Sequence, residues 1–192
     1  MIPAPVKWAF SIFMVLFIPM NLLTYGPGNF LWFSDITLFL AFLAVLTESR
    51  LVASMAAVGG IIFESLWAAA FFLAIISDFR FELTEYMFDS SIPLWIRIIS
   101  LFHLILPPLL FWLLFRLGYD RRAWPLQIVV VWMVALLTWF WTEPSQNINY
   151  IFTYQKINWN PIPFLLLEAG VLAILLTLTH LLITKIKLIK TK

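Results

Sequence analysis

Residues 28–42 read GNFLWFSDITLFLAF, an apolar and aromatic run that contains a single acid, Asp35. The run belongs to an apolar stretch that is long enough to cross a hydrocarbon layer of about 30 Å as a helix. An ionisable side chain at such a depth costs about 2.5–3.5 kcal/mol on insertion scales, so Asp35 must face the interior of a bundle. The stretch therefore predicts a membrane protein with a polar interior.

The composition also favours a membrane protein over a soluble domain. Of 192 residues, 63% are hydrophobic and only 11% are charged, and the mean hydropathy is +0.98. A soluble domain carries about 25% charged residues. The chain contains no cysteine, which excludes disulfides and thiolate metal sites. We expect one transmembrane domain over residues 1–192, without a cofactor or a bound metal.

Six stretches are long and apolar enough to be membrane helices, because a helix rises about 1.5 Å per residue. The predicted fold class is all-α, an integral membrane bundle of six transmembrane helices. The expected spans are about Trp8–Tyr25, Asn29–Thr47, Leu51–Ser77, Leu94–Leu117, Trp124–Thr142 and Pro163–Lys185.

The basic residues predict the orientation of this bundle. With six spans, both termini share one side with the second and fourth loops. That side holds nine of the twelve basic residues, against three on the other (9 + 3 = 12): Lys7, Arg50, Arg116, Arg121, Arg122, Lys185, Lys187, Lys190 and Lys192. Because cytoplasmic loops are enriched in Lys and Arg, we expect both termini in the cytoplasm, N-in and C-in. The two long connections, 78–93 and 143–161, then face outward.

Four ionisable residues from four spans lie between the outer interface and the midplane: Asp35, Glu64, His103 and Glu168. Helix rise places Asp35 and Glu168 about 9 Å below the outer end, and His103 about 14 Å. Each must point inward and find a partner, so we expect one shared polar cluster that binds a ligand. The alternative is that the acids only hydrogen-bond between helices and fix their packing.

The fourth span adds a candidate nucleophile to this cluster. Ser100 lies three residues before His103 and therefore on the same helical face. Pro107 and Pro108 follow, and they predict a kink, because each removes a helical hydrogen bond to a carbonyl four residues earlier. His103 and Ser100 are thus the candidate catalytic residues if the protein is an enzyme.

The outer loop 143–161 is rich in Asn and aromatic residues. Asn147 and Asn149 are candidates for hydrogen bonds to a head group or a sugar, and equally for helix caps and turns. We find no phosphate-binding, zinc-protease or serine-hydrolase motif. The basic residues are explained by the positive-inside rule and by lipid head groups, so nucleic-acid binding is not expected.

The segments NFLWFSDI, ISLFHLILPPLLFWLLFRLGYDRRAW, NINY and LTHLL resemble a family of small bacterial multi-pass proteins labelled only as membrane-associated. The resemblance covers most of the chain and implies a bacterial inner-membrane location, with no established activity. More loosely, acidic residues and His at one depth resemble intramembrane lipid hydrolases and acyltransferases. No residue here matches their motifs, so no catalytic roles are carried over.

The preferred hypothesis is a protein that handles an apolar or amphiphilic small molecule or a lipid in an outward-facing intramembrane cavity, as a carrier or binder. One alternative is an intramembrane lipid-modifying enzyme that uses His103 as general base. Another is a non-catalytic subunit or scaffold that binds partner subunits. The expected partners are membrane lipids and the small molecule.

Overall fold

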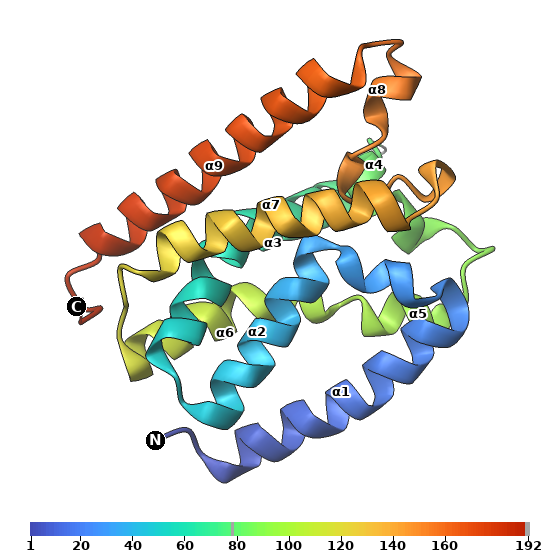
Figure 1. The fold of residues 1–192 in the computed structure, drawn as a ribbon. Coiled ribbons are helices and arrows are strands. Elements are labelled where there is room, and N and C mark those ends of the chain that lie inside the picture. The colour runs from blue at the N-terminus through green and yellow to red at the C-terminus, as the bar shows by residue number, and fades with distance from the viewer. Residues whose placement is uncertain (78, 191–192) are drawn as a thin grey trace.

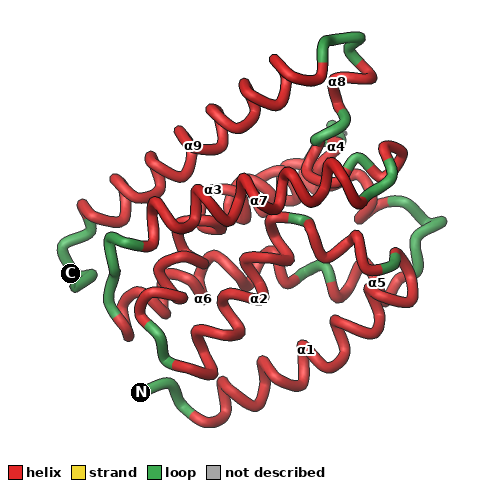
Figure 2. Tube along the Cα trace, in the orientation of Figure 1, coloured by secondary structure: helices red, strands yellow, loops and turns green. Residues whose placement is uncertain are grey.

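The computed structural model describes residues 1–77 and 79–190, and within them every regular element is helical (Figures 1 and 2). The main helices are α1 (Ala4–Tyr25), α2 (Phe33–Thr47), α3 (Arg50–Ile76), α5 (Leu94–Ile99), α6 (Phe102–Leu117), α7 (Ala123–Trp141) and α9 (Pro161–Lys185). Short elements connect them at one end: η1 (Pro27–Leu31), α4 (Glu82–Glu85), η2 (Tyr86–Phe88), η3 (Pro144–Gln146), η4 (Ile148–Tyr150) and α8 (Thr153–Lys156).

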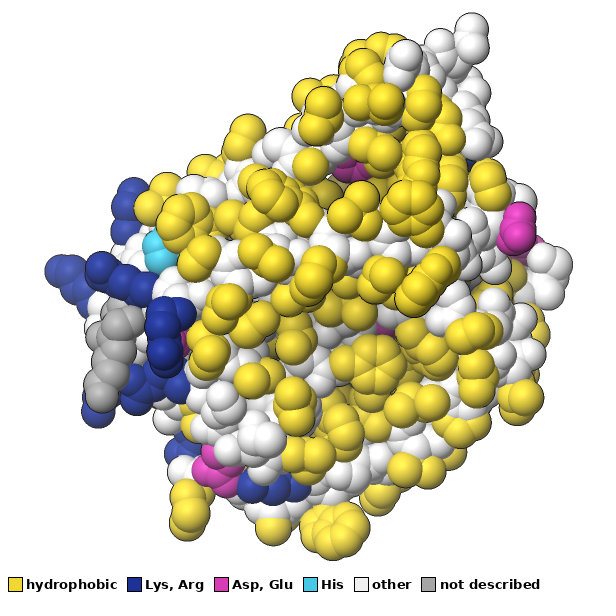
Figure 3. Space-filling view, in the orientation of Figure 1, with side chains coloured by type: hydrophobic (Ala, Val, Ile, Leu, Met, Phe, Trp, Pro, Cys, Tyr) yellow, Lys and Arg dark blue, Asp and Glu magenta, His cyan; other side chains and the backbone are white. Residues whose placement is uncertain are grey.

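The bundle has the surface of a membrane protein. In the described residues, five helical segments are long and apolar enough to cross a membrane: α1, α3, the α5–α6 segment Leu94–Leu117, α7 and α9. Large apolar side chains such as Trp8, Leu23 and Phe140 are exposed, and they cover the face seen in Figure 3. Such a surface is unstable in water and matches hydrocarbon. The prediction of an all-helical membrane bundle is confirmed at this level.

Helix α3 forms the centre of the bundle, where it packs against α2, α6, α7 and α9 (Figure 1). Its small residues Ala53, Ala56, Ala57 and Gly60 are fully buried. Small side chains let membrane helices approach closely. A Cβ atom at Gly60 would collide with Thr37 of α2 and Leu110 of α6. The absence of a side chain at Gly60 therefore sets the spacing of three helices.

The fourth predicted span is divided into α5 and α6. The interruption lies at Ser100 and Leu101, where the amides of Leu101, His103 and Leu104 donate to carbonyls three residues earlier. Such bonds tighten the chain relative to an α-helix. Helix α6 then continues through Pro107 and Pro108, and the interruption lies before it, at Ser100 and Leu101. The turn places Ser100 and His103 at the start of α6.

The end of the bundle where both termini lie (Figure 1) is closed by the turn between α6 and α7. The amide of Tyr119 donates to the carbonyl of Lys190 at 2.8 Å, and Asp120 donates its amide to Ser54 Oγ at 2.9 Å. Gly118 adopts a positive φ of 86°, and a Cβ there would lie 2.8 Å from the same Lys190 carbonyl oxygen. Glycine is the residue that satisfies both constraints.

Candidate functional site

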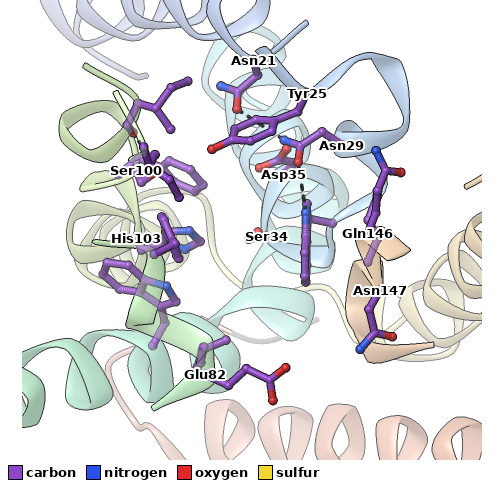
Figure 4. Close-up of a pocket in the computed structure, with 18 of the residues that line it drawn as sticks. Asn21, Tyr25, Asn29, Ser34, Asp35, Glu82, Ser100, His103, Gln146 and Asn147 are labelled. Carbon is purple, nitrogen blue, oxygen red and sulfur yellow. Dashed lines mark hydrogen bonds between the residues drawn. The ribbon is translucent and has the colours of Figure 1, made fainter. Parts of the chain in front are cut away.

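A cavity of about 460 Å³ (Figure 4) is lined by residues from the elements that lie away from the termini in Figure 1. Its walls come from the ends of α1 and α3, from η1 and the start of α2, from the α4–η2 segment, from the α5–α6 turn and from the η3–η4 loop. Aromatic side chains such as Phe17, Trp32, Trp67 and Phe102 form much of the wall. A cavity of this size, mostly apolar with a few polar groups, is typical of a small-molecule site.

His103 and Glu64 form a buried pair at this cavity. His103 Nδ1 lies 2.6 Å from Glu64 Oε2, and the two residues are 9% and 2% exposed. The Trp67 ring stacks on the imidazole, with centroids 4.4 Å apart and planes at 19°. Glu64 and Trp67 are three residues apart on α3 and share one helical face. The pair fixes the imidazole ring and leaves Nε2 as the ring nitrogen available to the cavity, which His103 lines.

Asp35 lies across the cavity from His103 (Figure 4). It is in the first turn of α2, where the helix dipole favours an acid. The residue is only 4% exposed, and its buried Oδ2 has no hydrogen-bond partner among residues 1–77 and 79–190. Asp35 also interacts electrostatically with Glu64, a group of like sign. A buried acceptor without a donor costs free energy, which a donor from a ligand would offset.

Tyr86 is a cavity residue that sequence reasoning missed. Tyr86 belongs to η2, and its side chain forms hydrogen bonds with Ser100 and Trp67. It also interacts electrostatically with Asp35 and Glu64. Burial raises the pKa of the Tyr86 hydroxyl above its usual value, so it stays a neutral donor. In the sequence, Tyr86 lies in the acidic connection 78–93, and no spacing of residues there predicts a contact with Ser100.

The structure brings three of the four predicted polar residues together and separates the fourth. Asp35, Glu64 and His103 belong to one cluster, and Ser100 lines the same cavity. Glu168 lies in a second depression of about 360 Å³, which is divided from the cavity by Glu82 and Tyr150, residues that line both. Helix α9 packs on the outside of the bundle against α7 and α3 (Figure 1), so its acid does not reach α2.

The Ser100 hydroxyl is not bonded to the His103 imidazole in this arrangement. Its Oγ donates to the Ile96 carbonyl at 2.9 Å, while His103 Nδ1 is engaged by Glu64. The two candidate catalytic residues therefore share a cavity without forming a nucleophile–base hydrogen bond.

Asn147 and Asn149 hold the loop 143–161 in place through side-chain hydrogen bonds. Asn149 Oδ1 accepts from the amide of Phe33 at 2.9 Å, and its Nδ2 donates to the Leu31 carbonyl at 2.7 Å. Its carboxamide thus pairs with the backbone just before and at the start of α2. Asn147 accepts from the amide of Phe152 and donates to Thr153 within its own loop. Asn147 lines the cavity, whereas the polar atoms of Asn149 are used by η1 and α2.

We expect Asn149→Ala to destabilise the protein by at least about 2 kcal/mol. The change leaves two backbone groups without their partner, and it puts alanine at a φ of 54°, which is unfavourable for a residue other than Gly or Asn. Unfolding in mixed detergent micelles measures the loss. Gln155→Ala is the control, because Gln155 is exposed and its side chain donates to the hydroxyl of its neighbour Tyr154. Equal stability of the two variants would contradict this role of Asn149.

The second histidine lies at the opposite end of the bundle. His180 Nδ1 is 2.6 Å from the Tyr119 hydroxyl, and the Trp124 ring stacks on it with centroids 5.1 Å apart. These contacts join α9 to the turn between α6 and α7, so His180 is not part of the cavity cluster. Among residues 1–77 and 79–190, no three His, Asp or Glu side chains are arranged to hold a metal ion.

The function of this protein has to be inferred from its structure, because no known protein provides a guide. Comparison of the chain with family models, with curated proteins and with solved structures gives no match. The functional interpretation therefore depends on three observations described above: the cavity, the Glu64–His103 pair and the unpartnered Asp35.

Proposed function

We propose that this protein binds an apolar or amphiphilic small molecule, such as a lipid, in an outward-facing intramembrane cavity, and that it serves as a carrier or binder. The observation that carries the proposal is Asp35, a buried carboxyl whose Oδ2 has no partner among the described residues, at a cavity of about 460 Å³. A scaffold whose acids only fix packing would pair them with neighbouring side chains.

We further propose six membrane crossings with both termini in the cytoplasm of a bacterial cell. Helix α2 returns the chain from the end where α1 finishes to the end where α3 begins (Figure 1). Its 15 residues rise only about 22 Å, less than a hydrocarbon layer of about 30 Å, so the residues of η1 would have to complete the crossing. The Lys and Arg side chains gather at the end with the termini (Figure 3), which favours that end as cytoplasmic. We place the chain, by its sequence motifs, with the small bacterial membrane-associated proteins.

A cavity-filling variant tests the binding function. Ser34 lines the cavity, and Ser34→Trp fills it without removing Asp35 or His103. Ser65→Trp makes the same change at an exposed position of α3 and is the control. Each protein in nanodiscs is incubated with a bacterial polar-lipid extract, and the retained molecules are identified by mass spectrometry. We expect a species retained by the parent protein and by Ser65→Trp but lost in Ser34→Trp; retention by all three, or by none, would refute the proposal.

A carrier adds a requirement for proton exchange at the cluster. Uptake of the retained molecule into proteoliposomes should depend on the pH gradient and should disappear in His103→Ala, because the variant removes an imidazole that can accept and release a proton at the cavity. Uptake by His103→Ala at the parent rate would exclude the carrier function and leave the binding function.

The Glu64–His103 pair favours a second candidate, an intramembrane lipid-modifying enzyme. A carboxylate on Nδ1 orients an imidazole so that Nε2 can act as general base. Ser100 or a water would then be the nucleophile. Product formation from a labelled lipid extract, abolished in His103→Ala, would support the enzyme, and product formation unchanged in His103→Ala would oppose it. Stoichiometric partner subunits on purification would instead support a scaffold.

A further inference from the structure

The charges around the cavity point to the class of its ligand. Two carboxylates line it, Asp35 and Glu82, and neither Lys nor Arg lines it within the described part of the chain. Glu82 is 65% exposed and already pairs with Lys156 at 2.9 Å. His103 is held by Glu64. Asp35 is therefore the one lining carboxylate, among described residues, for which no counter-charge is supplied, and it is 4% exposed.

The walls complement a cation as well. Trp32, Trp67, Tyr86 and Phe102 line the cavity together with Asp35. Aromatic rings attract ammonium groups through the negative charge of their faces, and the attraction is stronger when water is excluded. An anion would meet the carboxylates of Asp35 and Glu82 and, among the described residues, no Lys or Arg in the wall. A neutral ligand gives the charged form of Asp35 no counter-charge, so a carboxyl this buried would take up a proton beside it, whereas a cation stabilises the charged form.

We propose that the cavity takes an organic cation, an amphiphilic amine or quaternary ammonium whose positive head lies against Asp35 and whose apolar part packs on the aromatic wall. This inference rests on the proposed binding function and names its ligand class. The volume of about 460 Å³ accommodates a molecule of drug-like size. The loops that carry Glu82 and Asn147 border the cavity (Figure 4).

A pair of ligands that differ only in charge provides the test. Benzyltrimethylammonium and its uncharged carbon isostere neopentylbenzene are titrated into the protein in nanodiscs, with empty nanodiscs as the partition reference. Calorimetry reports binding, and so does quenching of tryptophan fluorescence, to which Trp32 and Trp67 in the cavity wall contribute. We expect the cation to bind at least about tenfold more tightly than the isostere, and phenylacetate, an anion, not to bind.

A matched pair of variants then assigns the effect to one carboxylate. Asp35→Asn should weaken binding of the cation by about tenfold or more, because it removes a charge-assisted contact. Glu168→Gln, the same chemical change in the neighbouring depression, should leave the affinity within about twofold. Equal affinities for the cation and the isostere in the parent protein, or unchanged cation binding in Asp35→Asn, would overturn the inference.

The outcomes separate the two proposals. If the isostere binds the parent protein but not Ser34→Trp, and the cation binds no better, the cavity is a ligand site and only the cation assignment fails. If neither molecule binds and no lipid is retained, the binding function fails too. The comparison of cation with isostere uses the parent protein alone, so it holds even if Asp35→Asn does not fold.

Discussion

Glu64→Ala is expected to lower the free energy of unfolding by about 3–5 kcal/mol. Glu64 is 2% exposed and is bonded to His103 Nδ1 at 2.6 Å. Removing one member of a buried pair leaves the other without its partner in a medium that solvates it poorly. Unfolding of the purified protein in mixed micelles of rising dodecyl-sulfate content measures the change.

Three variants separate the pair from other effects of the substitution. Glu64→Gln keeps the volume and an acceptor for an imidazole N–H, so it should cost less than Glu64→Ala. The double variant Glu64→Ala with His103→Ala should cost less than the sum of the single variants, because the two side chains interact directly. Glu82→Ala breaks an ion pair that is more than half exposed, and it should cost no more than about 1 kcal/mol. A Glu64→Ala loss as small as that of Glu82→Ala would contradict the buried pair.

Gly60→Ala is expected to destabilise the bundle by about 1–3 kcal/mol, although alanine is the better helix former by about 1 kcal/mol. The added Cβ would collide with Thr37 and with Leu110, whose Cδ1 lies 2.8 Å from it. Since α2, α3 and α6 meet at this point, the collision forces the helices apart. The same micelle unfolding measures the loss.

The control for Gly60 is another helical glycine in the same chain. At Gly170 of α9, a Cβ would meet no atom within 4 Å. Gly170→Ala should therefore leave stability unchanged or raise it by up to about 1 kcal/mol through helix propensity alone. The two substitutions are chemically identical, so opposite changes in the free energy of unfolding would show that packing around each glycine causes the difference. Effects of the same sign would refute the close approach at Gly60.

The sequence predicts the class of fold because hydropathy and helix rise are strong constraints. Apolar run lengths give an all-helical membrane bundle, and the observed helices α1, α3, α7 and α9 begin and end within a few residues of the predicted spans. The start of α2 is less well predicted. Asn29 begins the predicted span, but the chain stays in η1 until Leu31, and α2 starts only at Phe33. The amide of Phe33 donates a hydrogen bond to the side chain of Asn149. That contact is 116 residues distant and has no local signature.

The candidate site shows where sequence reasoning stops. Depth along a helix follows from residue number, and Asp35, Glu64 and His103, which this reasoning groups together, do interact in the structure. The direction in which a helix faces depends on which neighbours it packs against, and this is why Glu168 on the outer helix α9 lies in another depression. Tyr86 was missed for a related reason, since it reaches Ser100 from a connection whose path is fixed only by tertiary contacts.

The bond between Tyr119 and the Lys190 carbonyl has a consequence for biosynthesis. The connection between α6 and α7 leaves the ribosome some seventy residues before the segment that completes it (190 − 119 = 71). During that interval the amide of Tyr119 must be satisfied by water or by a lipid head group. The turn between α6 and α7 can therefore complete its hydrogen bonding only after α9 and residues 186–190 have been synthesised and have reached it.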